Sequence, residues 1–288
     1  MRLTSFVAQG RETYGLVVGQ DALVDLGARV GERWSNLRRL IGSGELEAVG
    51  GEHGTAPADY RFDEVRFLPA IPRPTHILSS GGNFPAHIQE MVDAGMSKGA
   101  PPQPGFHVKT SGSLVGHLNP LVRPKASGQF DWENEFALVI GQGGRHIPRD
   151  RALDHVMGYS MLHDGSIRDV QLQQSVTAGK NFEASSSLGP WISTPDEVGD
   201  PNEIYLTTRL NGQVVQHEQV GSLVFPLDLL VSYVSGFINL QPGDVITTGT
   251  CGGVGFFRKP QLFMKAGDVV EFEADRIGVM RHEVIDEV

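Results

Sequence analysis

The chain has 288 residues, of which 40% are apolar and 20% are charged, and its formal net charge is -10. This composition is ordinary for a globular protein that is long enough to bury a large core. The acidic balance disfavours nucleic acids and anionic membranes as partners, because their phosphate groups repel a negatively charged surface. We therefore expect the ligand to be a small molecule or a metal ion.

The single cysteine, Cys251, excludes an intramolecular disulfide and fits a reducing compartment. No segment approaches the roughly 18 consecutive apolar residues that a membrane helix needs. The first residues also lack the apolar stretch of a secretory signal. These features predict a cytoplasmic protein that does not span a membrane.

The first part of the chain alternates short apolar runs with turns. Residues 3–7, 14–18 and 22–26 predict strands, and residues 34–40 predict a helix. Several prolines between residues 56 and 75 fix φ and interrupt hydrogen-bond ladders, as is typical of a connection between two units. We place a boundary near Pro72, which gives a small N-terminal α+β domain (1–72) and a larger domain (73–288).

The larger domain begins with a predicted strand over 76–79 and a glycine-rich turn, followed by a predicted helix over 85–94. On this helix His87 and Glu90 are three residues apart and therefore share a face. A short helix between glycine and proline segments is suited to cover a site as a mobile lid. The alternative is an ordinary surface histidine with a helical neighbour.

Glu133 and Glu135 interrupt the apolar segment 130–141, which predicts a single strand. Side chains two positions apart point to the same face of a strand, so these carboxylates should lie together. Ala137 and Val139 continue their face into the core. Two adjacent buried carboxylates repel each other, and a divalent cation between them would relieve this. The alternative is a strand with one solvated face.

A third carboxylate, Asp164, follows a predicted buried strand over 156–162. Three carboxylates form a site of hard oxygen ligands, which suits Mg²⁺ or Mn²⁺, with Ca²⁺ as a further candidate. Zinc would usually recruit histidine or cysteine. The alternative role for Asp164 is a turn or a helix cap.

Two later segments, 240–245 and 265–269, look like copies of one strand-turn-strand device with a Gly-Asp turn. The glycine-rich segments 141–144 and 249–255 lack the context of nucleotide-binding loops, which argues against a nucleotide site. The short segments rich in Val, Ile, Leu and Thr predict a sheet-dominated fold.

These motifs, in this order, resemble the fumarylacetoacetate hydrolase superfamily from about Thr75 onward, in particular its acylpyruvase-like and 2-hydroxyhepta-2,4-diene-1,7-dioate isomerase-like branch. The motifs that carry the resemblance are Asn83-Phe84-x-x-His87-x-x-Glu90, Lys109 in Phe-His-Val-Lys, Asp131-Trp-Glu133-Asn-Glu135, Asp164-Gly-Ser166-Ile-Arg168-Asp169-Val-Gln171, Gly179-Lys180-x-Phe182, Pro242-Gly243-Asp244 and Gly249-Thr250.

The resemblance implies a β-rich α+β fold, with a mixed β-sandwich roll and a small N-terminal domain, in a homodimer. It also implies a role for each residue of the candidate site. The metal ligands would be Glu133, Glu135 and Asp164. His87 with Glu90 would activate water, and Lys180 would stabilise developing negative charge. The residues in contact with substrate would be Lys109, Gln171 and Thr250, and Arg168 would either form a structural ion pair or anchor a substrate carboxylate.

We accordingly expect a metal-dependent hydrolase that cleaves a C–C bond in a small 2,4-dioxo acid of the acylpyruvate or fumarylpyruvate type, in the degradation of aromatic compounds. An oxaloacetate decarboxylase and an isomerase of 2-hydroxymuconate-type diacids are the enzymatic alternatives, because they need the same enolate-stabilising groups. A protein that binds an oxo-acid without turning it over is the alternative of another class.

Overall fold

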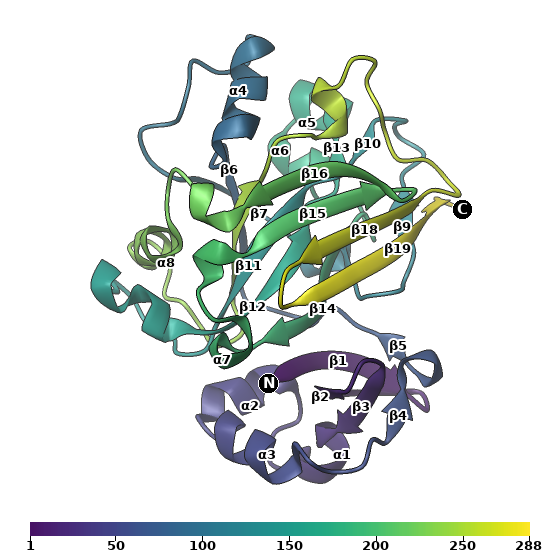
Figure 1. The fold of residues 1–288 in the computed structure, drawn as a ribbon, viewed down its shortest axis with the longest axis vertical. Coiled ribbons are helices and arrows are strands. Elements are labelled where there is room, and N and C mark those ends of the chain that lie inside the picture. Colours follow the sequence, from purple (N-terminus) through teal and green to yellow (C-terminus); the bar gives the residue numbers. More distant parts are fainter.

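The structure, a computed structural model, describes residues 1–288. Three β-sheets and short helices surround two adjoining apolar cores (Figure 1). The sheets are mixed, since β17 runs antiparallel to β11 but parallel to β6. The predicted β-rich α+β fold class is confirmed.

The largest sheet has twelve strands and passes through the whole molecule. Its order is β4 (Tyr60–Arg61), β3 (Ala22–Asp25), β2 (Arg11–Val18), β1 (Arg2–Ala8), β14 (Ser186–Ser193), β12 (Val156–His163), β11 (Asn134–Ile140), β17 (Val245–Thr250), β6 (Ile77–Gly81) and β7 (Gly105–Val108), with β5 (Arg66–Phe67) on β1 and β8 (Leu114–Val115) on β14.

A second sheet of five strands packs against the middle of the first, with β15 near β11 and β18 near β12. Apolar side chains of both sheets, among them Phe136 and Phe272, fill the larger core between them. The second sheet comprises β16 (Gln213–Gln219), β15 (Tyr205–Leu210), β18 (Val269–Ala274), β19 (Gly278–Asp286) and β9 (Leu121–Arg123), and a third sheet pairs β10 (Phe130–Asp131) with β13 (Ser166–Ile167).

Strand β11 is buried on both faces. Phe136 and Leu138 belong to the larger core, whereas Ala137 and Val139 belong to the smaller one. The predicted alternation along this strand is therefore confirmed, and the alternative with a solvated face is wrong.

The predicted single strand over 130–141 is wrong in one respect, because it is broken at Trp132 and Glu133. The carboxylate of Asp131 accepts hydrogen bonds from the backbone N–H groups of Trp132 (2.9 Å) and Gly255 (2.7 Å). These bonds turn the chain between β10 and β11. Glu133 thus lies just before β11, and its carbonyl oxygen accepts from the N–H of Asp164 at 2.9 Å.

The helices lie at the edges of the sheets. The predicted helix over 85–94 is confirmed as α4, while the helix predicted over 34–40 begins later, because Asn36 caps the N–H of Arg39 at 3.0 Å. None of them has the length and apolar character needed to cross a bilayer. The helices are α1 (Leu26–Val30), α2 (Leu37–Ser43), α3 (Leu46–His53), α4 (Pro85–Asp93), α5 (Arg168–Gln173), α6 (Val176–Gly179), α7 (Pro195–Val198) and α8 (Leu227–Ser235).

The elements before Pro72 lie together at one end of the molecule (Figure 1), yet the sheet continues from β1 into β14 through the pairing of Leu3 with Ile192.

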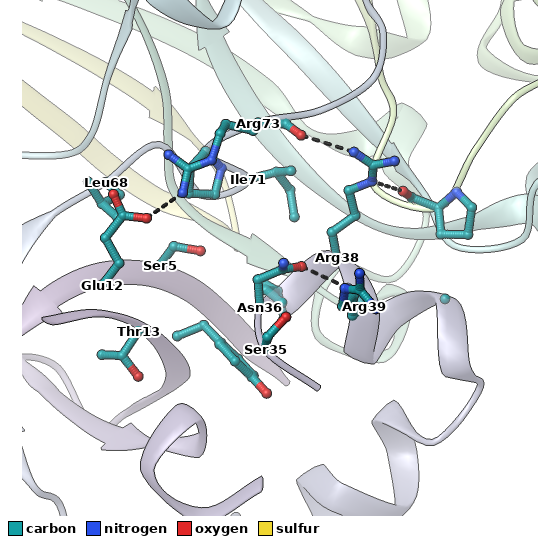
Figure 2. Close-up of a pocket in the computed structure, with 15 residues that line it drawn as sticks. Ser5, Glu12, Thr13, Ser35, Asn36, Arg38, Arg39, Leu68, Ile71 and Arg73 are labelled. Carbon is teal, nitrogen blue, oxygen red and sulfur yellow. Dashed lines mark hydrogen bonds and ion pairs between the residues drawn. The ribbon is translucent and has the colours of Figure 1, made fainter. Parts of the chain in front are cut away.

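A cavity of about 530 Å³ lies at the junction between these N-terminal elements and the rest of the molecule (Figure 2). There Arg38 of α2 donates to the carbonyl oxygens of Arg73 and Pro242, each at 3.1 Å. Because these residues precede β6 and β17, Arg38 ties the N-terminal part to the start of both strands. The domain boundary at Pro72 stays a prediction.

Candidate active site

The three predicted metal ligands converge at one end of β11 and β12. Single oxygen atoms of Glu133, Glu135 and Asp164 lie within 4.8 Å of one another, and all three residues are buried. Asp164 follows β12, which pairs with β11, and its position beside Glu133 is fixed by the backbone hydrogen bond between them. Gly165 is required next to it, because a Cβ there would lie 1.8 Å from the carbonyl oxygen of Ser185.

Two buried lysines neutralise part of this cluster. Lys180 Nζ lies 2.5 Å from Glu133 Oε2 and 2.8 Å from Asp164 Oδ2, and Lys109 Nζ lies 2.8 Å from Asp164 Oδ1. Burial alone would raise the pKa of Asp164, but Lys109 and Lys180 outweigh it and hold that pKa well below its usual range. Asp164 therefore remains a carboxylate, the form that a metal ion requires.

Glu133 is paired in the same way. Arg168 Nη1 lies 2.7 Å from Glu133 Oε1, and Arg168 Nε lies 2.8 Å from Asp131 Oδ2. Burial would raise the pKa of Glu133, but Lys180 and Arg168 lower it to about 2. The remaining guanidinium nitrogen of Arg168, Nη2, is buried and has no hydrogen-bond partner.

Glu135 lacks such compensation, since no basic side chain forms an ion pair with it. Its Oε2 accepts hydrogen bonds from Ser79 Oγ at 2.5 Å and from Thr247 Oγ1. Burial raises the pKa of Glu135 well above its usual value, and the carboxylates of Asp164 and Glu133 raise it further. An additional positive charge beside Glu135 would remove this penalty, so the residues fit a divalent cation with oxygen ligands.

His87 and Glu90 form the predicted pair on α4. His87 Nδ1 lies 3.0 Å from Glu90 Oε2, and Glu90 Oε1 accepts from the N–H of Gly253 at 2.7 Å. The backbone thus holds the carboxylate in place, and the carboxylate orients the imidazole ring. Such a histidine can take a proton from a bound water molecule.

A cavity of about 790 Å³ opens beside the acid cluster. Six of the predicted residues line it: His87, Glu133, Arg168, Gln171, Lys180 and Thr250. Glu90, Glu135 and Asp164 are not among the residues that line it. Lys109, predicted to contact substrate, does not line it either, because its side chain is fully buried and donates to Ser186 Oγ at 2.6 Å.

Sequence reasoning missed two groups of residues at the site. Ser79, Thr247 and His107 contact the acid cluster, with His107 Nε2 2.9 Å from Asp164 Oδ2. Period-two spacing from Lys109 would have placed His107 on the same face of its strand. The second group is apolar and lines the outer part of the cavity; its members, Met91, Met96, Phe106, Leu172, Val176 and Phe257, come from segments far apart in the sequence.

The sheet-rich fold with a buried three-carboxylate cluster defines a class of α+β proteins suited to divalent metal ions. Residues 76–285 match the family described as fumarylacetoacetate (FAA) hydrolase C-terminal. The chain therefore belongs to the fumarylacetoacetate hydrolase family of enzymes, and the resemblance that its motifs indicated is confirmed.

Several known proteins are similar to the chain. The human protein named oxaloacetate tautomerase FAHD2A, mitochondrial, is 39% identical over 225 residues, which are 77% of this chain and 70% of that protein. The crystal structure of a fumarylacetoacetate hydrolase from Exiguobacterium antarcticum has a TM-score of 0.83 and 30% identity, with full coverage of both chains (100%). Maleylpyruvate hydrolase from Sphingobium sp. SYK-6, solved with manganese(II) and pyruvate, has a TM-score of 0.81 and 27% identity, again over 100% of both chains.

Proposed function

We propose that the protein is a divalent-metal-dependent hydrolase that cleaves a C–C bond in a small 2,4-dioxo acid of the acylpyruvate type. The observation that carries this proposal is the His87–Glu90 pair, whose histidine lines the same cavity as Glu133, Lys180 and Arg168. Capture of an oxo-acid without reaction would not need a histidine oriented by a carboxylate.

Glu133, Glu135 and Asp164 would hold Mg²⁺ or Mn²⁺, and the manganese in the similar maleylpyruvate hydrolase supports such an ion. When bound, the cation would polarise the oxo group next to the substrate carboxylate and offset negative charge on its oxygen.

The residues of the chain supply the other steps. His87 takes a proton from water, and the hydroxide adds to the carbonyl carbon farther from the substrate carboxylate. The bond between this carbon and the neighbouring methylene carbon then breaks, and its electron pair passes to the pyruvate part as an enolate. The proton that His87 took from water then passes to the methylene carbon, which gives pyruvate, and the other product is a carboxylic acid. Lys180 and Arg168, which both form ion pairs with Glu133, would stabilise the negative charge that develops.

Replacement of His87 tests this role. We expect His87→Ala to lower kcat for acetylpyruvate about 10²- to 10⁴-fold, the usual contribution of a general base, with Mn²⁺ affinity unchanged. The loss of diketone absorbance measures the rate, and a calorimetric titration measures the affinity. Gln89→Ala, on the exposed face of the same helix, is the matched control and should keep full activity. Undiminished hydrolysis by His87→Ala would exclude this histidine as the base.

Oxaloacetate tautomerisation is the second candidate, favoured by the names of the curated relatives. It requires the same stabilised enolate but no attacking water, so His87 would not be needed as a hydrolytic base. Enol-to-keto conversion of oxaloacetate, followed by the decay of the enol absorbance with wild type and with His87→Ala, separates the two candidates. Pyruvate and CO₂ as the sole products would instead indicate a decarboxylase, and a rearranged diacid would indicate an isomerase.

We propose further that the protein is a cytoplasmic homodimer that acts in the degradation of aromatic compounds. The family resemblance supports the dimer and the pathway, while the cytoplasm rests on the sequence features above. Light scattering coupled to gel filtration measures the oligomeric state, and a mass of one chain would exclude the dimer.

A further inference from the structure

The outer part of the active-site cavity differs in character from its base. We call its apolar wall the acyl pocket, which consists of Met91, Met96, Phe106, Leu172, Val176 and Phe257. These residues come from α4 and the segment after it, from β7, from α5 and α6, and from the segment after β17. Figure 1 shows α4, α5 and α6 at the end of the molecule opposite the N-terminal part.

The fully charged residues of the cavity are all buried beside the acid cluster, and we call this part of the cavity its base. Of the 23 residues that line it, only Glu133, Arg168 and Lys180 carry a full charge, and Glu133 forms ion pairs with both Arg168 and Lys180. The other lining residues are apolar or uncharged polar, apart from the histidines His87 and His107. A second carboxylate at the far end of a substrate would find no lysine or arginine there, and its desolvation would be uncompensated.

The acyl pocket also leaves apolar side chains exposed to solvent. Met96 is 47% exposed, Leu172 49% and Val176 44%. Exposed apolar side chains that gather around a cavity often mark a ligand-binding site. The cavity volume of about 790 Å³ is also far more than a four-carbon acid requires, because drug-sized ligands occupy pockets of roughly 300–1,000 Å³.

We infer that the preferred substrate is an acylpyruvate with an apolar acyl group several carbons long. This inference rests on the proposed hydrolase function and specifies its substrate. The oxo-acid end occupies the charged base of the cavity, and the acyl chain lies along the acyl pocket. Leu172 and Val176 are the specificity-determining residues, because their side chains are exposed in the free protein and would be covered by the acyl chain of the substrate.

A series of acylpyruvates tests the inference. With wild-type protein and Mn²⁺ we expect kcat/KM to rise from acetylpyruvate to butanoylpyruvate to hexanoylpyruvate, by up to about fourfold for each added methylene. Fumarylpyruvate, which carries a carboxylate at the end of its acyl group, should react with a lower kcat/KM than butanoylpyruvate.

Variants of the acyl pocket give the second arm. Leu172→Gln with Val176→Thr should lower the ratio of kcat/KM for hexanoylpyruvate to that for acetylpyruvate at least fivefold, through KM rather than kcat. Leu153→Gln is the matched control, since Leu153 is also an exposed apolar residue (38%) but does not line the cavity. This control should leave the ratio unchanged.

The other possible results separate an error in the acyl pocket from an error in the proposed hydrolase function. If acylpyruvates are hydrolysed but kcat/KM is flat or falls with chain length, or if fumarylpyruvate is preferred, the apolar substrate is wrong and the hydrolase stands. An unchanged ratio in the double variant would also reject the acyl pocket. If no acylpyruvate is hydrolysed while oxaloacetate is tautomerised, the proposed hydrolase itself is wrong, and the inference falls with it.

Discussion

Lys109 and Lys180 both contact Asp164, yet their pKa values move in opposite directions. Burial lowers the pKa of Lys109, and its single ion pair, with Asp164, only partly offsets this, whereas ion pairs with both Asp164 and Glu133 outweigh burial at Lys180 and raise its pKa. Lys180 also lines the cavity, and Lys109 does not. At the scale of single residues, the number of ion-paired carboxylates therefore distinguishes the lysine that lines the cavity from the lysine that only contacts Asp164.

A buried histidine away from the site leads to a prediction about pH. Burial lowers the pKa of His282 from 6.5 to about 4. In this range the folded protein binds fewer protons than the unfolded chain, so stability present above pH 6.5 is lost as the pH falls toward 4. We expect His282→Asn, which can still donate to the carbonyl oxygen of Asn119, to reduce the loss of unfolding free energy between about pH 7 and pH 5 by about 2 kcal/mol.

Urea unfolding at several pH values measures this difference. His146→Asn, the same change at an exposed histidine, is the control and should leave the pH dependence as it is in the wild type. An identical pH dependence in His282→Asn and wild type would contradict the role assigned to His282.

At the scale of elements, the two Gly-Asp segments form closely similar turns. Gly243 and Gly267 have φ values of 81° and 87°, which favour glycine, and Asp244 and Asp268 each accept from the backbone N–H three residues earlier, at 2.8 and 2.9 Å. Each turn leads into a strand, β17 or β18, without the preceding strand that the sequence predicted.

Asp244 has an additional function, because it joins two strands that support the acid cluster. It accepts from the backbone N–H of His76 at 2.9 Å and contacts His76 Nδ1 at 2.8 Å, and thus connects the start of β17 to the start of β6. Farther along these strands Thr247 and Ser79 hydrogen-bond to Glu135. Asp244 is therefore coupled to the candidate metal ligand through both strands.

Replacement of either aspartate by alanine distinguishes the two turns. We expect both Asp244→Ala and Asp268→Ala to lower the unfolding free energy, by about 3 kcal/mol for Asp244 because its carboxylate is fully buried and accepts from two backbone N–H groups. Only Asp244→Ala should also weaken Mn²⁺ binding, by at least threefold, measured by calorimetric titration. Equal Mn²⁺ affinity in the two variants would contradict the coupling of Asp244 to Glu135.

At the scale of the whole molecule, the acid cluster joins segments that span most of the chain. Glu135 contacts Ser79 and Thr247, and Asp164 contacts Lys109 and Lys180, so one cation would link parts of three strands and the segments after β7, β12 and α6. A ligand that binds only the folded state stabilises it in proportion to the logarithm of its concentration.

Metal addition should consequently raise the thermal unfolding temperature. At Mn²⁺ or Mg²⁺ concentrations 100-fold above Kd we expect about 2.7 kcal/mol of stabilisation, seen as a shift of several degrees in differential scanning calorimetry. Glu135→Gln should lose this shift yet fold without metal, because a neutral amide removes the repulsion at this position. An equal metal-induced shift in Glu135→Gln would exclude Glu135 as a ligand.

The sequence alone determined the family, the sheet-rich fold and the convergence of Glu133, Glu135 and Asp164. Strand periodicity and the ligand preferences of hard cations are local properties, which a linear pattern reveals. The break before β11, the partners Ser79, Thr247 and His107, the burial of Lys109 and the acyl pocket depended on the tertiary structure. Each of them results from contacts between strands and segments far apart along the chain, and only the register of the folded sheets brings their side chains together.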